Sequence, residues 1–304
     1  MTNNFNLIGI LSLVFAMFIW GSSFIALKAA MDDLAPFTVI FIRMLAASLC
    51  FVYFIKSFLK YDFTKKDIKF ILLLAIFEPC LYFIFEAKAL QLTSASQAGM
   101  IASLMPLITA MAAGYFLKEI ITRKLILGSA LAMIGVVSLS VNATTSASAP
   151  NPLLGNFLEL LAMSCAAGYT IVARYLTHKF SALFITAIQA FIGAIFFFPF
   201  FIYEYFNTPM VFSVEALSWT LYLGVVVTLG GYGLYNFALT KLEASKTAVF
   251  VNLIPIFTLL LAYIILGEKL TNFELTASAV ILAGVILSQM PPMKMPKIRR
   301  KKKI

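Results

Sequence analysis

The chain has 304 residues, of which 62% are hydrophobic and 12% are charged, and its mean hydropathy is +0.97. Soluble domains are about 45–50% apolar and about 25% charged, so this composition excludes a water-soluble fold and predicts a polytopic membrane protein. The formal net charge of +10 does not indicate a nucleic-acid partner, because seven of the 23 Lys and Arg residues lie in the C-terminal tail. Basic residues that flank a membrane span set topology and contact anionic lipid headgroups.

About 20 apolar residues cross the hydrocarbon core, and a crossing segment is helical because its backbone groups have no water to pair with. By this measure the sequence predicts ten transmembrane helices joined mostly by short connections. They cover residues 7–28, 36–56, 68–90, 94–117, 123–141, 153–175, 181–202, 216–239, 245–266 and 272–289. The longest polar break, residues 142–152, separates two halves of five helices each.

The expected organisation is an all-α membrane protein in four segments. Residues 1–141 form a first five-helix repeat, 142–152 an extracytoplasmic linker, 153–290 a second five-helix repeat, and 291–304 a basic cytoplasmic tail. The orientation follows from the excess of Lys and Arg that cytoplasmic loops carry. With both termini in the cytoplasm, 19 basic residues lie inside and only Lys28, Lys88 and Lys269 lie outside, while Arg43 lies within a span.

Two stretches match one another at a shift of 149 residues. Residues 96–119 read SQAGMIASLMPLITAMAAGYFLKE, and residues 245–268 read SKTAVFVNLIPIFTLLLAYIILGE. The matched positions include Ser96/Ser245, Pro106/Pro255, Thr109/Thr258, Glu119/Glu268 and, before the stretches, Leu90/Leu239. Earlier spans align weakly at a shift of 146, with Lys28 opposite Arg174.

An odd number of spans in each half makes the repeat inverted, because the second half then enters the membrane from the opposite face. Inverted repeats are a recurring architecture of secondary transporters, which bind their substrate near the membrane midplane between the two repeats. The repeat therefore predicts a transporter with a central site.

Ionisable residues within the predicted spans are candidate functional groups, because a charge at the centre of a transmembrane helix costs about 2.5–3.5 kcal/mol. Glu78, Tyr82 and Glu86 fall at i, i+4 and i+8 of the third span and share one helix stripe. Glu78 lies near mid-depth, where burial favours the protonated form, so it is the candidate for proton coupling. Arg43 and Glu159 either form interhelical ion pairs, as Arg43–Glu86 or Arg43–Glu159, or face a cavity that takes a charged substrate or relays a proton.

Pro106 and Pro255 each lie near the middle of an apolar helix. A proline has no N–H, so the carbonyls of Ala102 and Val251 lose their helical partner and a bend is expected at each site. The two bends are interpreted either as symmetry-related hinges beside the cavity or as simple packing curvature. Glu119 and Glu268, at the ends of the same helices, are expected to anchor those ends at the membrane surface.

Aromatic and amide side chains of the spans are candidates for lining the site. The proposed substrate-binding residues are Trp20, Tyr82, Glu86, Tyr232, Asn236 and Asn252. Tyr169 and Tyr235 are further aromatic candidates. Each of these side chains has helix packing as its alternative role.

Three stretches carry a family resemblance. They are WGSSFIALK at 20–28, ALQLTSASQAGMIASLMPLI at 89–108 and NFALTKLEASKTAVFVNLIPIFTLLLAYIILGEKL at 236–270. The chain resembles the EamA family of the drug/metabolite transporter (DMT) superfamily over nearly its whole length. The resemblance implies two five-helix repeats, a multi-pass protein of the bacterial inner membrane, and export or uptake of small metabolites, amino acids or drugs. Two departures are LKE at 117–119 in place of LGE, and Ala166–Ala167 where the first half has Trp20–Gly21.

Enzyme and primary-pump functions find no support in the sequence, which has no HExxH, GxSxG or Walker motif and no metal-ligand cluster. The predicted function is a secondary transporter, without cofactor, that exports a small amino-acid-like solute or drug by alternating access. A lipid-linked carrier translocase and a non-transporting scaffold or sensor are the alternatives. A transporter predicts a polar cavity bordered by spans one, three, six and eight, a translocase a cavity open to the bilayer, and a scaffold a dry packed centre.

Overall fold

The computed structural model describes residues 2–116, 123–143, 145–242 and 244–290, and the basic tail 291–304 and Glu119 lie outside the described residues. Within the described ranges the chain is almost entirely helical and forms no strand beyond one isolated bridge between Ser146 and Ala149. The all-α class expected from the hydropathy is thus the class observed.

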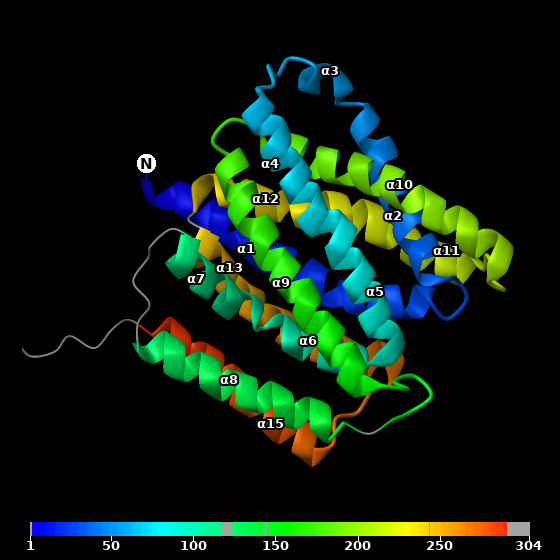
Figure 1. Ribbon diagram of the computed structural model, residues 1–304, viewed down its shortest axis with the longest axis vertical. Helices are drawn as coiled ribbons and strands as arrows, with labels where there is room; N and C mark the ends of the chain where they lie inside the picture. Colours follow the sequence, from blue (N-terminus) through cyan, green and yellow to red (C-terminus); the bar gives the residue numbers. More distant parts are fainter. Residues whose placement is uncertain (1, 117–122, 144, 243, 291–304) are drawn as a thin grey trace, which may run out of the picture.

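The first part of the chain runs from α1 to α8 (Figure 1). Its helices are α1 (Thr2–Ala30), α2 (Pro36–Val52), α3 (Ile55–Phe58), α4 (Lys65–Ala75), the wide π-helical turn η1 (Ile76–Leu81), α5 (Tyr82–Leu92), α6 (Ala95–Ala102), α7 (Met105–Phe116) and α8 (Arg123–Val141). Side-chain oxygens start several of them. Thr64 forms a capping box with Asp67 at α4, and Ser94 accepts the Gln97 N–H at α6.

The second part follows residues 142–151 and runs from α9 to α15. Its helices are α9 (Pro152–Leu176), α10 (Ala182–Asn207), α11 (Val214–Tyr222), the π-helical η2 (Leu223–Tyr232), α12 (Gly233–Lys241), α13 (Ala244–Val249), the 3₁₀ turn η3 (Phe250–Leu253), α14 (Ile254–Leu261), the π-helical η4 (Ala262–Leu266) and α15 (Asn272–Gln289). Ser181, Ser213 and Thr271 cap α10, α11 and α15 in the same way as in the first part.

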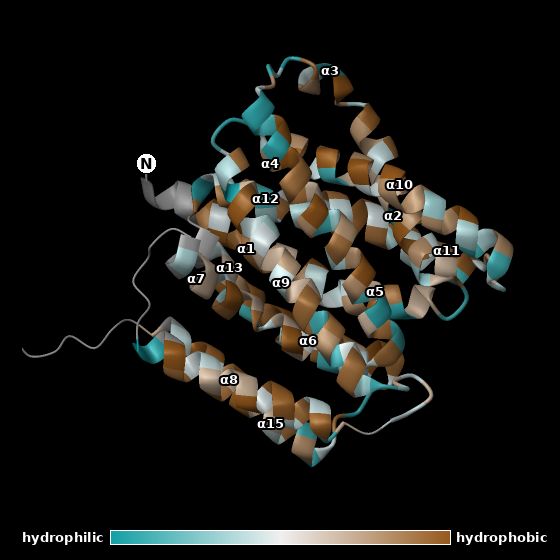
Figure 2. Ribbon diagram, in the orientation of Figure 1, coloured by the Kyte–Doolittle hydropathy of each residue, from teal (hydrophilic) through white to brown (hydrophobic). Residues whose placement is uncertain are grey.

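Seven helical segments of the described chain are long and apolar enough to cross a membrane. They are Leu7–Ala30, Lys65–Leu92, Ala95–Ala112, Pro152–Leu176, Ala182–Asn207, Val214–Lys241 and Thr247–Leu266. Shorter apolar helices are Pro36–Val52, Ile126–Val141 and Asn272–Ser288. Figure 2 shows hydrophobic residues along most of the helix lengths and hydrophilic residues mainly at helix ends and in connections. The chain is a polytopic membrane protein.

Three of the predicted spans are interrupted. In the third predicted span, Glu78 has extended backbone angles (φ −152°, ψ 121°) between α4 and α5. Pro79 explains the break, because the proline ring disfavours the helical conformation of the residue before it. The fourth predicted span is divided at Ser103–Leu104, between α6 and α7, and the ninth at η3, between α13 and α14.

The interruptions fall at corresponding places in the two parts. Helix α7 begins at Met105 and α14 begins at Ile254, which lie 149 residues apart, and each is followed at once by the proline. In the second part the carbonyl of Val251, which Pro255 leaves without its usual partner, accepts the Ile254 N–H. The third predicted span and the eighth predicted span each contain a π-helical turn, η1 and η2 respectively.

A basic side chain ties α1 to the end of α5 in the first part and α9 to α12 in the second. Lys28 Nζ donates to the carbonyl oxygens of Leu90 at 3.3 Å and Thr93 at 2.5 Å, and Arg174 donates to the carbonyl of Leu239. Lys28 with Arg174, and Leu90 with Leu239, are matched positions of the repeat. The same contact is therefore made twice by equivalent residues.

Helices α8 and α15 lie side by side along one edge of the molecule (Figure 1). Their backbones approach closely through small residues: a Cβ atom added to Gly128 would lie 2.5 Å from the Gly284 carbonyl oxygen. Close approach through small residues is the usual means of helix association in membranes, where burial of apolar surface contributes little.

Candidate functional site

A narrow cavity of about 30 Å³ lies between the two parts of the chain. Its polar and aromatic lining is Trp20, Ser23, Arg43, Glu78, Tyr82, Glu86, Tyr169, Thr170 and Tyr232, and its apolar lining is Phe24, Ala102, Met105, Met163, Ala166, Val251 and Ile254. This volume holds about two water molecules, whereas pockets for drug-sized ligands are about 300–1,000 Å³. In this conformation the cavity has no room for an organic solute.

Glu78 and Tyr232 join the two parts across this cavity. The Tyr232 hydroxyl donates a hydrogen bond to Glu78 Oε1, and both side chains are buried. Trp20 packs against Tyr232 and Tyr235 with ring centroids 4.9 and 4.7 Å away, and the Tyr169 ring stands at 88° to that of Tyr232. A buried carboxyl group is thus enclosed by aromatic rings from both parts.

Glu86 and Trp20 bring polar atoms without partners to the cavity. Glu86 Oε1 accepts a hydrogen bond from the Tyr82 hydroxyl at 2.7 Å, but Glu86 Oε2 has no partner. Trp20 Nε1 is likewise buried without an acceptor. Buried polar groups are nearly always hydrogen-bonded, so one donor and one acceptor are available here to a ligand or to water.

Arg43 is buried and lines the same cavity. Its Nε donates to Thr228 Oγ1 at 2.9 Å, and its guanidinium carbon lies 4.4 Å from the centre of the Phe83 ring. The expected ion pairs Arg43–Glu86 and Arg43–Glu159 are not formed, because within the described part of the chain only Lys179 and Asp67 approach within 4.0 Å as an ion pair. Stacking and the threonine hydroxyl hold the guanidinium instead.

The structure separates three of the predicted site residues from the cavity lining. Glu159 on α9 is fully buried, and neither of its carboxylate oxygens has a hydrogen-bond partner. Asn236 lies behind the cavity, where its amide nitrogen donates to the Tyr169 hydroxyl at 2.8 Å and to Thr186 Oγ1 at 3.0 Å. Asn252 is half-buried in η3, and its Oδ1 has no partner.

The two proline breaks border the cavity symmetrically. Ala102 and Met105 flank the first break, Val251 and Ile254 flank the second, and all four line the cavity. Ala102 and Val251 are 149 residues apart, and so are Met105 and Ile254, which is the shift of the repeat. Pro106 and Pro255 therefore lie next to the site, because each directly follows a residue that lines the cavity.

Some site residues were not singled out from the sequence. Ser23 and Thr170 line the cavity, and Thr228 holds Arg43 from the opposite part. Hydroxyl residues in apolar helices commonly bond to their own backbone, as Ser23 does with the Trp20 carbonyl, so the sequence alone does not distinguish them. Pro79 was a usable signal for the break at Glu78.

A family model described as the EamA-like transporter family matches the chain twice, over residues 7–141 and 153–290. An uncharacterized transporter of Archaeoglobus fulgidus is 29% identical over 91% of this chain and 96% of its own length. The uncharacterized transporter YetK of Bacillus subtilis is 27% identical, with 91% and 85% coverage. A protein of Escherichia coli named as a probable amino-acid metabolite efflux pump is 23% identical, with 92% and 94% coverage.

A solved crystal structure has the same fold. It superposes with a TM-score of 0.65 at 16% sequence identity and covers 94% of this chain and 96% of that one. The two-fold match of the family model and the names of the relatives indicate a transporter rather than an enzyme.

Proposed function

The chain belongs to the EamA-like transporter family, and we propose that it is a secondary transporter that exports a small amino-acid-like solute by alternating access through the central cavity. The observation that carries this proposal is the composition of that cavity. Within a membrane protein it brings together Glu78, Glu86 and Arg43, with a free acceptor on Glu86 and a free donor on Trp20. Such intramembrane charges mark substrate or ion pathways.

The substrate class follows from the sign and placement of these groups. A carboxylate on the substrate would meet Arg43 and Trp20, while an ammonium group would meet Glu86 or Glu78. Tyr169, Tyr232 and Trp20 would pack on the apolar part of the molecule. The name of the Escherichia coli relative supports both the solute class and the outward direction.

The architecture that we propose consists of ten spans in two inverted five-helix repeats, with both termini in the cytoplasm of a bacterial cell and the chain in its inner membrane. Support comes from the 19-to-3 distribution of basic residues and from the breaks at Met105 and Ile254, which are 149 residues apart. The cavity lining by the equivalent pairs Ala102/Val251 and Met105/Ile254 also supports it.

The mechanism requires the cavity to enlarge, since about 30 Å³ is too small for any amino acid. We propose that the helices bend at the breaks before Pro106 and Pro255, so that the site opens first to one face of the membrane and then to the other. Glu78 would couple this motion to a proton, because its bond to Tyr232 joins the two repeats and depends on the protonation of the carboxyl group.

The experiment that tests the proposal compares metabolites inside and outside cells that overexpress the protein with those of cells that lack it. Accumulated small amines and amino acids are then tested for counterflow in liposomes that hold the purified protein. We expect at least one zwitterionic amine to show counterflow that Glu86→Gln abolishes. If no zwitterionic solute differs between the cells and none is exchanged by the liposomes, the proposal is wrong.

A further inference from the structure

We propose that the start of α4 forms a binding site for an anionic phospholipid, with two lysines for the headgroup and an apolar groove for an acyl chain. The groove has a volume of about 560 Å³ and is lined by Lys65, Ile68, Lys69, Leu72, Leu73 and Ile76. No residue of this site lines the central cavity, and the inference rests on the membrane location and orientation proposed above and not on the transported solute.

The order of residues along α4 fits a lipid that stands upright in one leaflet. Lys65, Lys69, Leu72 and Ile76 fall at i, i+4, i+7 and i+11 and share one stripe of the helix. From Lys65 to Ile76 the stripe is about 16 Å long, at about 1.5 Å per residue. The two lysines lie at the end of the stripe next to the preceding loop. Leu72 and Ile76, which are exposed, lie farther along the helix from that loop.

The charge around the groove is strongly positive. Residues 53–69 hold five lysines (Lys56, Lys60, Lys65, Lys66 and Lys69) and two aspartates (Asp62 and Asp67). Among the described residues no acidic side chain lies within 4.0 Å of Lys56, Lys60, Lys65 or Lys69. The cationic charge is therefore available to a phosphate group from outside the protein.

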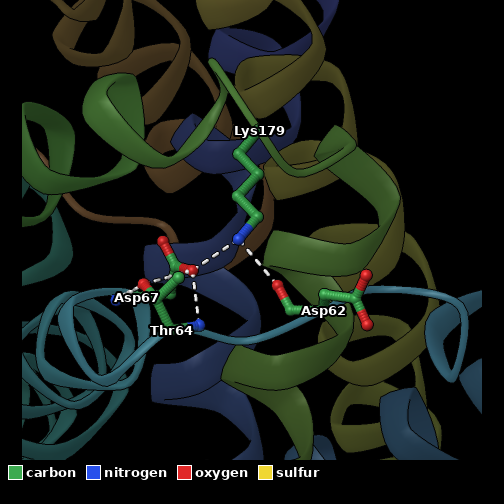
Figure 3. Close-up of polar contacts among 4 residues, drawn as sticks. All are labelled: Asp62, Thr64, Asp67 and Lys179. Atoms are coloured by element: carbon green, nitrogen blue, oxygen red, sulfur yellow. Dashed lines mark hydrogen bonds and ion pairs between the residues drawn. The ribbon is translucent and has the colours of Figure 1, made fainter.

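One of the two aspartates is already engaged, as Figure 3 shows. Asp67 Oδ2 accepts from Thr64 N at 2.9 Å and from Lys179 Nζ at 2.5 Å, and Lys179 Nζ also donates to the Asp62 carbonyl at 2.6 Å. These contacts fix the first turn of α4 against the α9–α10 connection. They neutralise Asp67 without using Lys65 or Lys69.

The preceding segment has the composition of a membrane-interface segment. Tyr53 and Leu59 are 85% and 79% exposed on either side of α3, and Lys56 and Lys60 alternate with them. Aromatic and apolar side chains interleaved with lysines are typical of segments at the headgroup level. A segment of this composition would hold the lysines of the groove at the depth of the lipid phosphates.

Anionic lipid is the occupant that this charge favours over a zwitterionic one. Polybasic segments at the cytoplasmic surface attract anionic lipids, and on the orientation proposed above the groove opens to the cytoplasmic leaflet. Each lysine near an anionic surface strengthens binding by about five-fold. Loss of both groove lysines is then expected to weaken binding by roughly 30-fold.

The test measures binding of phosphatidylglycerol and phosphatidylcholine to the purified full chain by native mass spectrometry. The variant is Lys65→Gln/Lys69→Gln, and the control is Lys269→Gln, an exposed lysine near the opposite end of the helices. We expect the wild type and the control to retain phosphatidylglycerol and the double variant to lose it by roughly 30-fold. Equal binding by all three proteins, or equal retention of both lipids by the wild type, would overturn the proposal.

A second measurement uses only the wild type, so it does not depend on the folding of a variant. Phosphatidylglycerol with a photoreactive group in its acyl chain is incorporated into nanodiscs with the protein. We expect the label to concentrate on residues 68–76. A label spread over all lipid-facing helices in proportion to their exposure would contradict a specific site.

Discussion

The Tyr232 hydroxyl, from the second part of the chain, donates a hydrogen bond to the Glu78 carboxyl, from the first part, at the residue where the helix between α4 and α5 is interrupted. The bond thus joins the two parts across the candidate site. Loss of the bond is expected to alter the coupling between the parts more than the fold, because the Tyr232 ring also packs against Trp20 and Tyr169.

Tyr232→Phe removes this bond and keeps the ring. A hydrogen bond contributes about 0.5–1.5 kcal/mol, and more when the acceptor is charged, so we expect the transport rate in liposomes to change by up to about ten-fold and the melting temperature to fall by only a few degrees. Tyr263→Phe is the matched control, since Tyr263 is exposed on the outer face of η4. Equal rates in both variants would show that the bond has no role in transport.

Glu78→Gln fixes the side chain in a neutral form. We expect this variant to lose transport driven by a pH gradient while it keeps counterflow, because exchange of labelled for unlabelled solute requires no net proton movement. The measurement is uptake into liposomes with and without an imposed gradient. If the gradient stimulates the variant as strongly as the wild type, Glu78 does not couple the proton.

Thr228→Val tests how Arg43 is held. The substitution removes the hydroxyl that accepts the Arg43 Nε–H and preserves the shape of the side chain. We expect the KM for a solute with a carboxylate to rise by about ten-fold, which corresponds to the loss of one hydrogen bond to a charged group. Thr276→Val, on the exposed face of α15, should leave the KM unchanged. If Thr228→Val and this control have the same KM, Thr228 does not orient Arg43 for substrate binding.

Gly128→Ala tests the close packing of α8 on α15. The added methyl group would lie 2.5 Å from the Gly284 carbonyl oxygen, so the helices must separate or shift. Overpacking of this kind costs about 1–3 kcal/mol, and we expect a lower melting temperature in detergent. Gly233→Ala is the control, because nothing lies within 4 Å of a Cβ atom there. Identical melting temperatures would mean that the two helices are not packed in this way.

The cavity brings together seven of the candidate site residues singled out from the sequence: Trp20, Arg43, Glu78, Tyr82, Glu86, Tyr169 and Tyr232. The cost of a charge in a membrane indicates such residues without any knowledge of tertiary structure. The partner of a buried charge cannot be predicted from this cost. Arg43, for example, donates a hydrogen bond to Thr228, which lies 185 positions away in the sequence. Whether a side chain reaches the cavity also depends on tertiary packing. Asn236 follows Tyr232 by one helical turn, yet it bonds to Tyr169 behind the lining.

The local backbone conformation is the second feature in which the structure differs from what the sequence predicts. Hydropathy averages over about 20 residues and does not detect a single extended residue, so the third span was expected to be continuous. Pro79 makes Glu78 extended through a local steric clash. The breaks before Pro106 and Pro255 follow from the proline pattern, but the matching starts of α7 and α14 come from the structure.

Alternating access requires the cavity between the two parts to open in turn to the two sides of the membrane. A single cysteine in the cavity lining reports on that opening. Ser23→Cys, in a chain whose native cysteines Cys50, Cys80 and Cys165 are replaced by Ala, places a thiol in the cavity lining. We expect a membrane-impermeant maleimide to label this thiol in both right-side-out and inside-out vesicles, and we expect transported solute to slow the labelling on both sides. Labelling from one side only under all conditions, or from neither side, would contradict alternating access.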